Sequence, residues 1–122
     1  QLLGSAPFLP FSGAEDCLTI NVWTPAWTSV SSVLPEDQFK PVLVWTYGGS
    51  FLHGKSSDPQ YNMRNFVNAN PDVVAVSFNY RLGPFGYIAL PELNSTNLAM
   101  QDQRAALQWV ANNIVAFGGD PN

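Results

Sequence analysis

The pattern of apolar and polar residues predicts β-strands in three segments of the chain. The segment CLTINVW (Cys17–Trp23) alternates and is rich in β-branched residues, which is typical of a strand, and Pro25 stops it. The segments PVLVWTY (Pro41–Tyr47) and VVAVSFNY (Val73–Tyr80) are almost continuously apolar. Such runs are typical of strands whose two faces are both buried, so we expect both segments to lie inside a covered sheet.

Helical patterns follow the second and the third of these segments. Residues Gln60–Asn70 predict a weak helix, which Pro71 ends. The clearest pattern runs from Leu98 to Phe117, where Ala106 and Ala111 flank one apolar face. The residues of that face are spaced seven, three, four and three positions apart: Met100, Leu107, Val110, Ile114 and Phe117. Candidate caps at the two ends are Ser95, Thr96 or Asn97 before the helix and Gly118-Gly119 after it.

The segments between these elements are rich in turn-forming residues and predict loops at 24–40 and around Gly83, Pro84 and Gly86. Strand, helix, strand and helix in succession is typical of a parallel α/β sheet. The closing residues 118–122, GGDPN, form a helix stop and a turn, after which a further strand would be expected. A sheet of about three strands with two covering helices would leave its edges bare. We therefore expect residues 1–122 to be a fragment of one larger α/β domain.

The composition argues against several classes of function. Hydrophobic residues make up 46% of the chain and charged residues 11%, as in ordinary core-forming sequence. The formal net charge is −4 and the five basic residues are scattered, so we expect no nucleic-acid binding. No apolar run approaches the roughly 20 residues of a membrane span. The single histidine and single cysteine predict no metal site, and no signal peptide is recognisable at the start.

The stretch WTYGGSF (Trp45–Phe51) is the clearest candidate for chemistry. It stands at the carboxyl end of a predicted strand, where ligands gather in open α/β sheets. Its two glycines allow a sharp turn that brings N–H groups against a ligand. A plain tight turn and an anion cradle both fit the local sequence. No phosphate-binding glycine pattern is present, so an oxyanion site is favoured over a phosphate site.

Four blocks of the sequence resemble motifs of the type-B carboxylesterases and lipases, the cholinesterase-like group of α/β-hydrolases. Glu15–Trp23 is similar to the start of the motif EDCLxLNVxxP, and Pro41–Phe51 is similar to PVxVxxxGGGF. Phe78–Tyr87 resembles NYRLGxxGF, and Asn97–Asn122 resembles GNxGLxDQxxALxWVxxNIxxFGGDPxxV. The blocks occur in the order of the family across residues 15–122.

The resemblance implies a partial α/β-hydrolase fold, with mostly parallel strands and covering helices. It implies a serine carboxylic-ester hydrolase that acts on small-molecule or lipid esters without a cofactor. The N–H groups of Gly49 and Ser50 would form part of the oxyanion hole, with Gly48 shaping the turn. Ser50 stands where the family more commonly has a third glycine, and it has less freedom in φ. The alternative is a non-catalytic, cholinesterase-like adhesion or binding domain, which keeps the fold and loses the nucleophile.

The resemblance also implies that the catalytic residues lie outside this chain. The serine elbow of the family follows the GGDPN segment, and the histidine of its triad comes later still. We therefore expect no catalytic residue in residues 1–122, no activity of the chain by itself, and the remainder of the hydrolase chain as its partner. An intact pair of glycines at Gly48 and Gly49 favours the enzyme over the adhesion domain.

Other polar residues are expected to have structural roles. His53 is expected to be a polar loop residue and not a catalytic base. Glu15 and Asp16 point to opposite faces of an extended segment and cannot act as an acid–base pair, and the resemblance implies a structural Glu15. Arg81 and Asp102 are expected to form ion pairs with partners that the sequence does not assign. Three aromatic residues are expected in the core or the substrate gorge: Trp45, Phe51 and Tyr87.

Cys17 and Asn94 bear on where the protein is located. Cys17 is the only cysteine, so the residues alone allow a free thiol or a disulfide to a partner outside the chain. The resemblance favours the disulfide, with a cysteine upstream of Gln1. Asn94 opens an Asn-Ser-Thr sequon in a polar segment and is a candidate glycosylation site. Together these two residues favour a secreted protein.

Overall fold

A computed structural model describes residues 14, 16–25, 38–89, 92 and 96–122. Within these residues, strands β1 (Ile20–Trp23), β2 (Val42–Trp45) and β3 (Val74–Phe78) form one sheet in the order β1-β3-β2. Strands β2 and β3 are parallel, as the sequence predicts, but β1 runs antiparallel to β3. The α/β class is confirmed, and the sheet is mixed. The direction of β1 was not predictable because alternation along a strand carries no information about the direction of its neighbour.

Strand β3 lies in the middle of the sheet, and all five of its residues are buried, as its apolar run predicts. The expectation of burial on both faces is wrong for β2, where Leu43 is 40% exposed. Strand β2 is at the edge of the described sheet, so one flank of the strand has no neighbour there. All three strands are shorter than their predicted segments.

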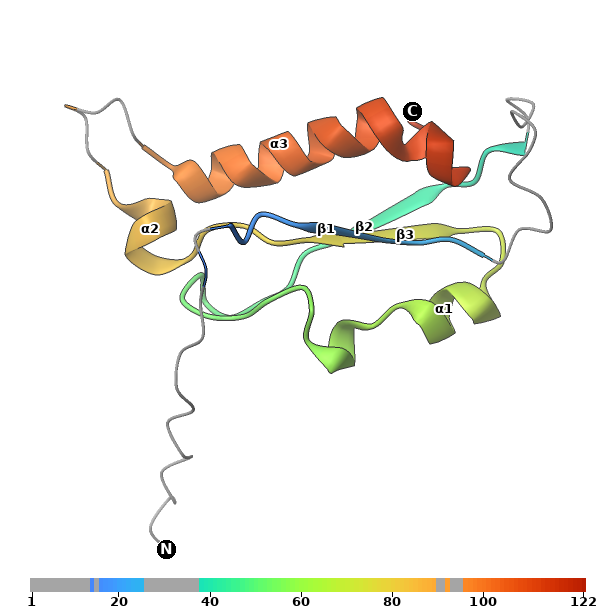
Figure 1. Cartoon of the computed structure of the whole chain (residues 1–122), viewed down its shortest axis with the longest axis horizontal. Helices are drawn as coiled ribbons and strands as arrows, with labels where there is room; N and C mark the ends of the chain where they lie inside the picture. Colours follow the sequence, from blue (N-terminus) through green and yellow to red (C-terminus); the bar gives the residue numbers. More distant parts are fainter. Residues whose placement is uncertain (1–13, 15, 26–37, 90–91, 93–95) are drawn as a thin grey trace, which may run out of the picture.

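Helices cover both faces of the sheet (Figure 1). Helix α3 (Leu98–Asn113), followed by the 3₁₀ turn η4 (Ile114–Phe117), lies along one face, and α1 (Arg64–Ala69) lies on the other. Alternation along β3 divides its side chains between the two layers. On the α3 side, Val110 and Ile114 pack with Val74 and Val76 in one buried cluster. This cluster forms an apolar contact between the sheet and the helical layer. The site described below lies beyond the carboxyl ends of the strands.

The buried face of α3 differs from the face that the sequence predicts. Met100 and Leu107 are 54% and 51% exposed, whereas the small residues Ala99 and Ala106 are buried. Val110 and Ile114 are buried as predicted. The prediction chose the large apolar residues, but the face of α3 that packs on the buried cluster carries the small residues Ala99 and Ala106. The left-handed stop at Gly118 is confirmed, with φ 78°.

Three local predictions also need correction. The single helix expected over Gln60–Asn70 is split into the 3₁₀ turn η2 (Pro59–Tyr61) and α1. The loop expected around Gly83 contains a short helix, α2 (Gly83–Tyr87), whose first turn accommodates Pro84 because no intrahelical partner is needed there. Asn97 precedes α3 in a left-handed conformation and makes no side-chain capping bond.

Candidate functional site

The candidate site is the turn of residues 48–54, which follows β2 at the carboxyl end of the sheet. Figure 1 places this turn at the same end of the molecule as α2. The N–H of Gly83 donates to the carbonyl oxygen of Phe51 at 2.7 Å, and the rings of Phe51 and Tyr87 meet edge to face with centroids 5.2 Å apart. The segments that follow β2 and β3 are therefore joined, as expected where parallel strands end together.

The backbone of the turn has an unusual conformation at three successive residues. Gly49 has φ 140°, and the non-glycine residues Ser50 and Phe51 have φ 54° and 63°. The carbonyl oxygen of Gly49 accepts bonds from the N–H groups of Leu52 and His53, at 3.0 and 3.3 Å. A Cβ added to Gly49 would lie 1.9 Å from the carbonyl oxygen of His53, so this position requires glycine. A Cβ added to Gly48 would meet nothing within 4 Å.

Two adjacent N–H groups in this turn are available to a ligand. Within the described parts of the chain, neither the N–H of Gly49 nor that of Ser50 donates to a protein acceptor. Ser50 is exposed and Gly49 is half-buried. Successive backbone N–H groups in such a turn form a concavity that binds negative charge. The arrangement can therefore stabilise the oxyanion of an acyl-transfer intermediate.

A buried polar network holds the returning segment of the loop against the sheet. The side-chain amide of Asn21 donates to the hydroxyls of Ser56 and Ser77, at 3.0 and 3.2 Å. The Oδ1 atom of Asn79 accepts from the N–H of Ser56 at 2.8 Å, and its amide donates to the carbonyl oxygen of Cys17 at 3.0 Å. Sequence reasoning missed these residues. The sequence did contain an indication of this network: Asn21 and Ser77 are polar residues within predicted strands, and buried polar groups need hydrogen-bond partners.

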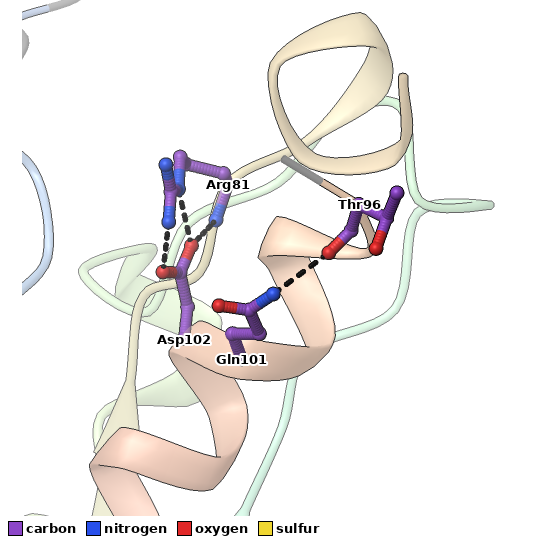
Figure 2. A network of polar contacts seen from close by, with 4 residues as sticks. All are labelled: Arg81, Thr96, Gln101 and Asp102. Atoms are coloured by element: carbon purple, nitrogen blue, oxygen red, sulfur yellow. Dashed lines mark hydrogen bonds and ion pairs between the residues drawn. The ribbon is translucent and has the colours of Figure 1, made fainter. Parts of the chain in front are cut away.

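Arg81 and Asp102 form one ion pair with each other (Figure 2). The Nε and Nη2 atoms of Arg81 donate to the two carboxylate oxygens of Asp102 at 2.7 and 2.6 Å, and the N–H of Arg81 adds a third bond at 3.0 Å. The expected scaffold role of both residues agrees with this contact, and the partner that the sequence left open is now assigned. The pair joins the segment after β3 to α3.

The ionisation of Asp102 is controlled by Arg81. Burial raises the pKa of Asp102, but the hydrogen bonds and the positive charge of Arg81 outweigh this effect and bring the pKa below its ordinary value of 3.8. The hydrogen bond to Asp102 raises the pKa of Arg81. The side chain of Asp102 is only 6% exposed. The carboxylate is nevertheless charged, because the bidentate contact with Arg81 replaces its lost hydration.

The other residues singled out from the sequence make no hydrogen bond to these N–H groups or lie outside the described residues. His53 is exposed in the turn, and Asp16 is exposed before β1. Cys17 is half-buried with a free thiol. Glu15 and Asn94 lie outside the described residues. No group of three metal-ligating side chains occurs among the described residues. No helix in that part of the chain is long and apolar enough to span a bilayer.

Comparison with known proteins places this turn in a family context. The Carboxylesterase family matches residues 3–122. Because the match covers almost the whole chain, the protein belongs to the carboxylesterase family. The chain is 43% identical to phenmedipham hydrolase of Pseudarthrobacter oxydans over 121 residues, which are 99% of this chain and 22% of that protein. It is 45% identical to para-nitrobenzyl esterase of Bacillus subtilis (strain 168), over 89% of this chain and 21% of that protein.

A solved structure agrees with these sequence relatives. A para-nitrobenzyl esterase structure superposes on 89% of this chain with a TM-score of 0.75 and 45% identity. The match covers 22% of that esterase chain, so the present chain spans about a fifth of the proteins it resembles. Since that esterase is an α/β-hydrolase, the described sheet and helices are part of an α/β-hydrolase fold.

Proposed function

We propose that this chain is part of a serine carboxylic-ester hydrolase and that it supplies two donors of the oxyanion hole, the N–H groups of Gly49 and Ser50. In this reaction a serine hydroxyl attacks the ester carbonyl, and negative charge develops on the carbonyl oxygen. Donors that are already aligned stabilise this charge without reorganising during the reaction. The nucleophile and its base would come from parts of the hydrolase outside these 122 residues.

The observation that carries this proposal is the turn at Gly49 and Ser50. Its two N–H groups are unpaired within the described residues, and they stand beyond the carboxyl end of a parallel strand pair. Membership of the carboxylesterase family supports the reaction type. The relative named as a para-nitrobenzyl esterase supports carboxylic esters as the substrate class. Which acyl and alcohol groups are accepted depends on parts of the site that this chain does not supply.

The proposal is tested in the full-length protein that carries these residues, with p-nitrophenyl acetate as substrate. Gly49→Ala should lower kcat by at least the ~10²–10³-fold that the loss of an oxyanion donor costs, because the added Cβ displaces the turn. Lys55→Ala is the control, since Lys55 is exposed and follows the turn, and it should retain activity within about threefold. A folded wild-type protein that neither hydrolyses the ester nor reacts with a serine-directed fluorophosphonate would contradict the enzyme and favour the adhesion domain.

We also propose that the protein is secreted, glycosylated at Asn94 and linked through Cys17 to a cysteine outside this chain. The lack of a second cysteine in this sequence, which leaves Cys17 only a partner outside it, and the Asn-Ser-Thr sequon at Asn94 support the proposal. Treatment of the secreted full-length protein with an N-glycosidase should increase its mobility on a gel, and Asn94→Gln should give the same increase. Alkylation of Cys17 without prior reduction would contradict the disulfide.

A further inference from the structure

Tyr47 and Tyr80 form a reciprocal contact directly beneath the proposed oxyanion turn. The hydroxyl of Tyr47 donates to the carbonyl oxygen of Tyr80 at 3.3 Å, and the hydroxyl of Tyr80 donates to the carbonyl oxygen of Tyr47 at 3.1 Å. Their rings stack with centroids 4.9 Å apart and an interplanar angle of 19°. Both residues are buried, with 4% and 6% of their surface exposed.

The two carbonyl oxygens lie beyond the regular ladder of the sheet. Pairing between β2 and β3 ends at Trp45 and Ser77, so neither carbonyl is part of the strand ladder. Each carbonyl instead accepts from the other tyrosine. If a buried carbonyl loses such a donor, the free-energy cost of removing it from water is no longer offset by a hydrogen bond. The hydroxyl pair therefore continues the connection between the two strands past the point where the sheet ends.

The turn is built directly upon Tyr47. This residue precedes Gly48, and the returning backbone passes over its ring, because a Cβ on Gly54 would lie 2.6 Å from the Cδ2 atom of that ring. The turn therefore starts at the residue bonded to Tyr47 and ends against the ring of Tyr47. A rotation of the Tyr47 ring would shift the returning end of the segment that presents the N–H groups of Gly49 and Ser50.

Tyr80 is the fixed side of the contact. The next residue, Arg81, is held to α3 by its bidentate pair with Asp102, and the N–H of Gly83 holds the carbonyl oxygen of Phe51 at 2.7 Å. The segment after β3 is therefore tied both to a helix and to the turn. Through the hydroxyl pair, Tyr80 transmits this fixed position to the backbone at Tyr47.

We infer that Tyr47 and Tyr80 are positioning residues for ester hydrolysis: their paired hydroxyls fix the direction of the Gly49 and Ser50 N–H groups. The inference rests on the proposed oxyanion role of the turn. Neither hydroxyl contacts the substrate in this role. Their effect is on the alignment of the donors, which matters most when the oxyanion forms, and less when the ester first binds.

The test uses Tyr47→Phe, Tyr80→Phe and the double variant in the full-length protein, because phenylalanine keeps the stacked ring and removes only the hydroxyl. Each single variant should lower kcat for p-nitrophenyl acetate roughly tenfold, less than the 10²–10³-fold cost of losing a donor. KM should stay within about twofold, because ground-state binding does not depend on the oxyanion. The double variant should be little worse than either single variant, since the pair acts as a unit.

Tyr61→Phe is the matched control, because Tyr61 packs on Trp45 beside β2 and takes no part in the hydroxyl pair. It should leave kcat within about twofold. Amide hydrogen exchange of Leu52 and His53, whose N–H groups bond to the carbonyl oxygen of Gly49, gives a readout that does not require catalysis. Exchange at these residues should become several-fold faster in Tyr47→Phe and Tyr80→Phe, and it should be unchanged in Tyr61→Phe.

The two readouts separate failure of this inference from failure of the proposed function. Unchanged exchange of the turn in both tyrosine variants would overturn the inference, whatever the kinetics show. Faster exchange with unchanged kcat would also overturn the inference. The pair would then stabilise the turn, but the alignment of the donors in catalysis would not depend on it. A wild-type protein without esterase activity would overturn the proposed function and, with it, the catalytic meaning of the pair.

Discussion

At the scale of single residues, the turn concentrates conformational strain where the proposed chemistry occurs. Ser50 and Phe51 are consecutive non-glycine residues with positive φ, a conformation that costs roughly 1–2 kcal/mol per residue. Such strain persists only where the surroundings hold the backbone in place. Here the hydrogen bonds of Gly49 and the bond between Phe51 and Gly83 supply that support.

Ser50→Gly should relieve part of this strain without removing the N–H donor. We expect the free energy of unfolding of the full-length protein to rise by about 0–1 kcal/mol. The strain energy that is relieved at positive φ exceeds the extra entropic cost of ordering a glycine on folding. Urea denaturation measures the change. Ser57→Gly is the control, because Ser57 does not have a positive φ, and it should give no gain. A larger loss of unfolding free energy in Ser50→Gly than in Ser57→Gly would contradict the presence of strain at Ser50.

The Arg81–Asp102 pair should make stability depend on acidic pH. The folded pKa of Asp102 is lowered, so the unfolded chain binds a proton more readily than the folded chain does. The contribution of the pair is therefore complete above the ordinary pKa of 3.8 and is lost as the pH falls through the folded pKa. Asp102→Asn should flatten this acid limb of a plot of unfolding free energy against pH. An acid limb of the same slope in the variant would assign it to other groups.

At the scale of elements, the contact of α3 with the sheet is made by small side chains near its start and larger ones near its end. Ala99 and Ala106 pack in one buried cluster with Tyr47 and Tyr80, here called the tyrosine cluster. Val110 and Ile114 pack with the valines of β3. The small residues lie toward the start of the helix, on the same part of α3 as Asp102, which bonds to Arg81.

Adjacent alanines on α3 test this arrangement. Ala106 is buried against the tyrosine cluster and Ala105 is exposed, so the same change to leucine has different consequences. Ala106→Leu should lower the free energy of unfolding by about 1–3 kcal/mol, because it overpacks the contact with the sheet. Ala105→Leu should stay within about 0.5 kcal/mol of the parent. Equal effects in thermal or urea denaturation would contradict the observed face of the helix.

At the scale of the whole molecule, the groups of the proposed site gather at one end of the sheet. The ends of β2 and β3 bring together the turn, the tyrosine pair and the Arg81–Asp102 pair, and the chain spans about a fifth of its relatives, 22% in one case. The sequence contains a single histidine, His53, which is exposed in the turn. Within this polypeptide the proposed oxyanion donors therefore have no buried serine–histidine pair beside them.

The purified 122-residue polypeptide should not turn over p-nitrophenyl acetate above the rate of the uncatalysed reaction. The proposed mechanism needs a nucleophilic serine with a histidine base, and donors without them provide no covalent step. The full-length protein, assayed at the same molar concentration, is the positive control. Turnover by the polypeptide that disappears in Gly49→Ala would contradict the absence of a nucleophile from these residues.

The sequence by itself determined the α/β class, the buried strand β3, the left-handed stop at Gly118 and the position of the candidate turn. These features depend on local properties: runs of apolar residues, the conformational freedom of glycine, and motifs whose spacing is fixed along the chain. The family assignment came from the same motifs and is confirmed by the match over residues 3–122.

Only the tertiary structure decided which distant groups meet. Four features each depend on segments far apart in sequence. They are the antiparallel direction of β1, the alanine face of α3, the ion pair of Arg81 with Asp102, and the reciprocal hydrogen bonds between Tyr47 and Tyr80. A single sequence gives the type of a residue but not its neighbour across the fold. The physical reason is that packing distance between layers selects small or large side chains, and it acts only once the layers are together.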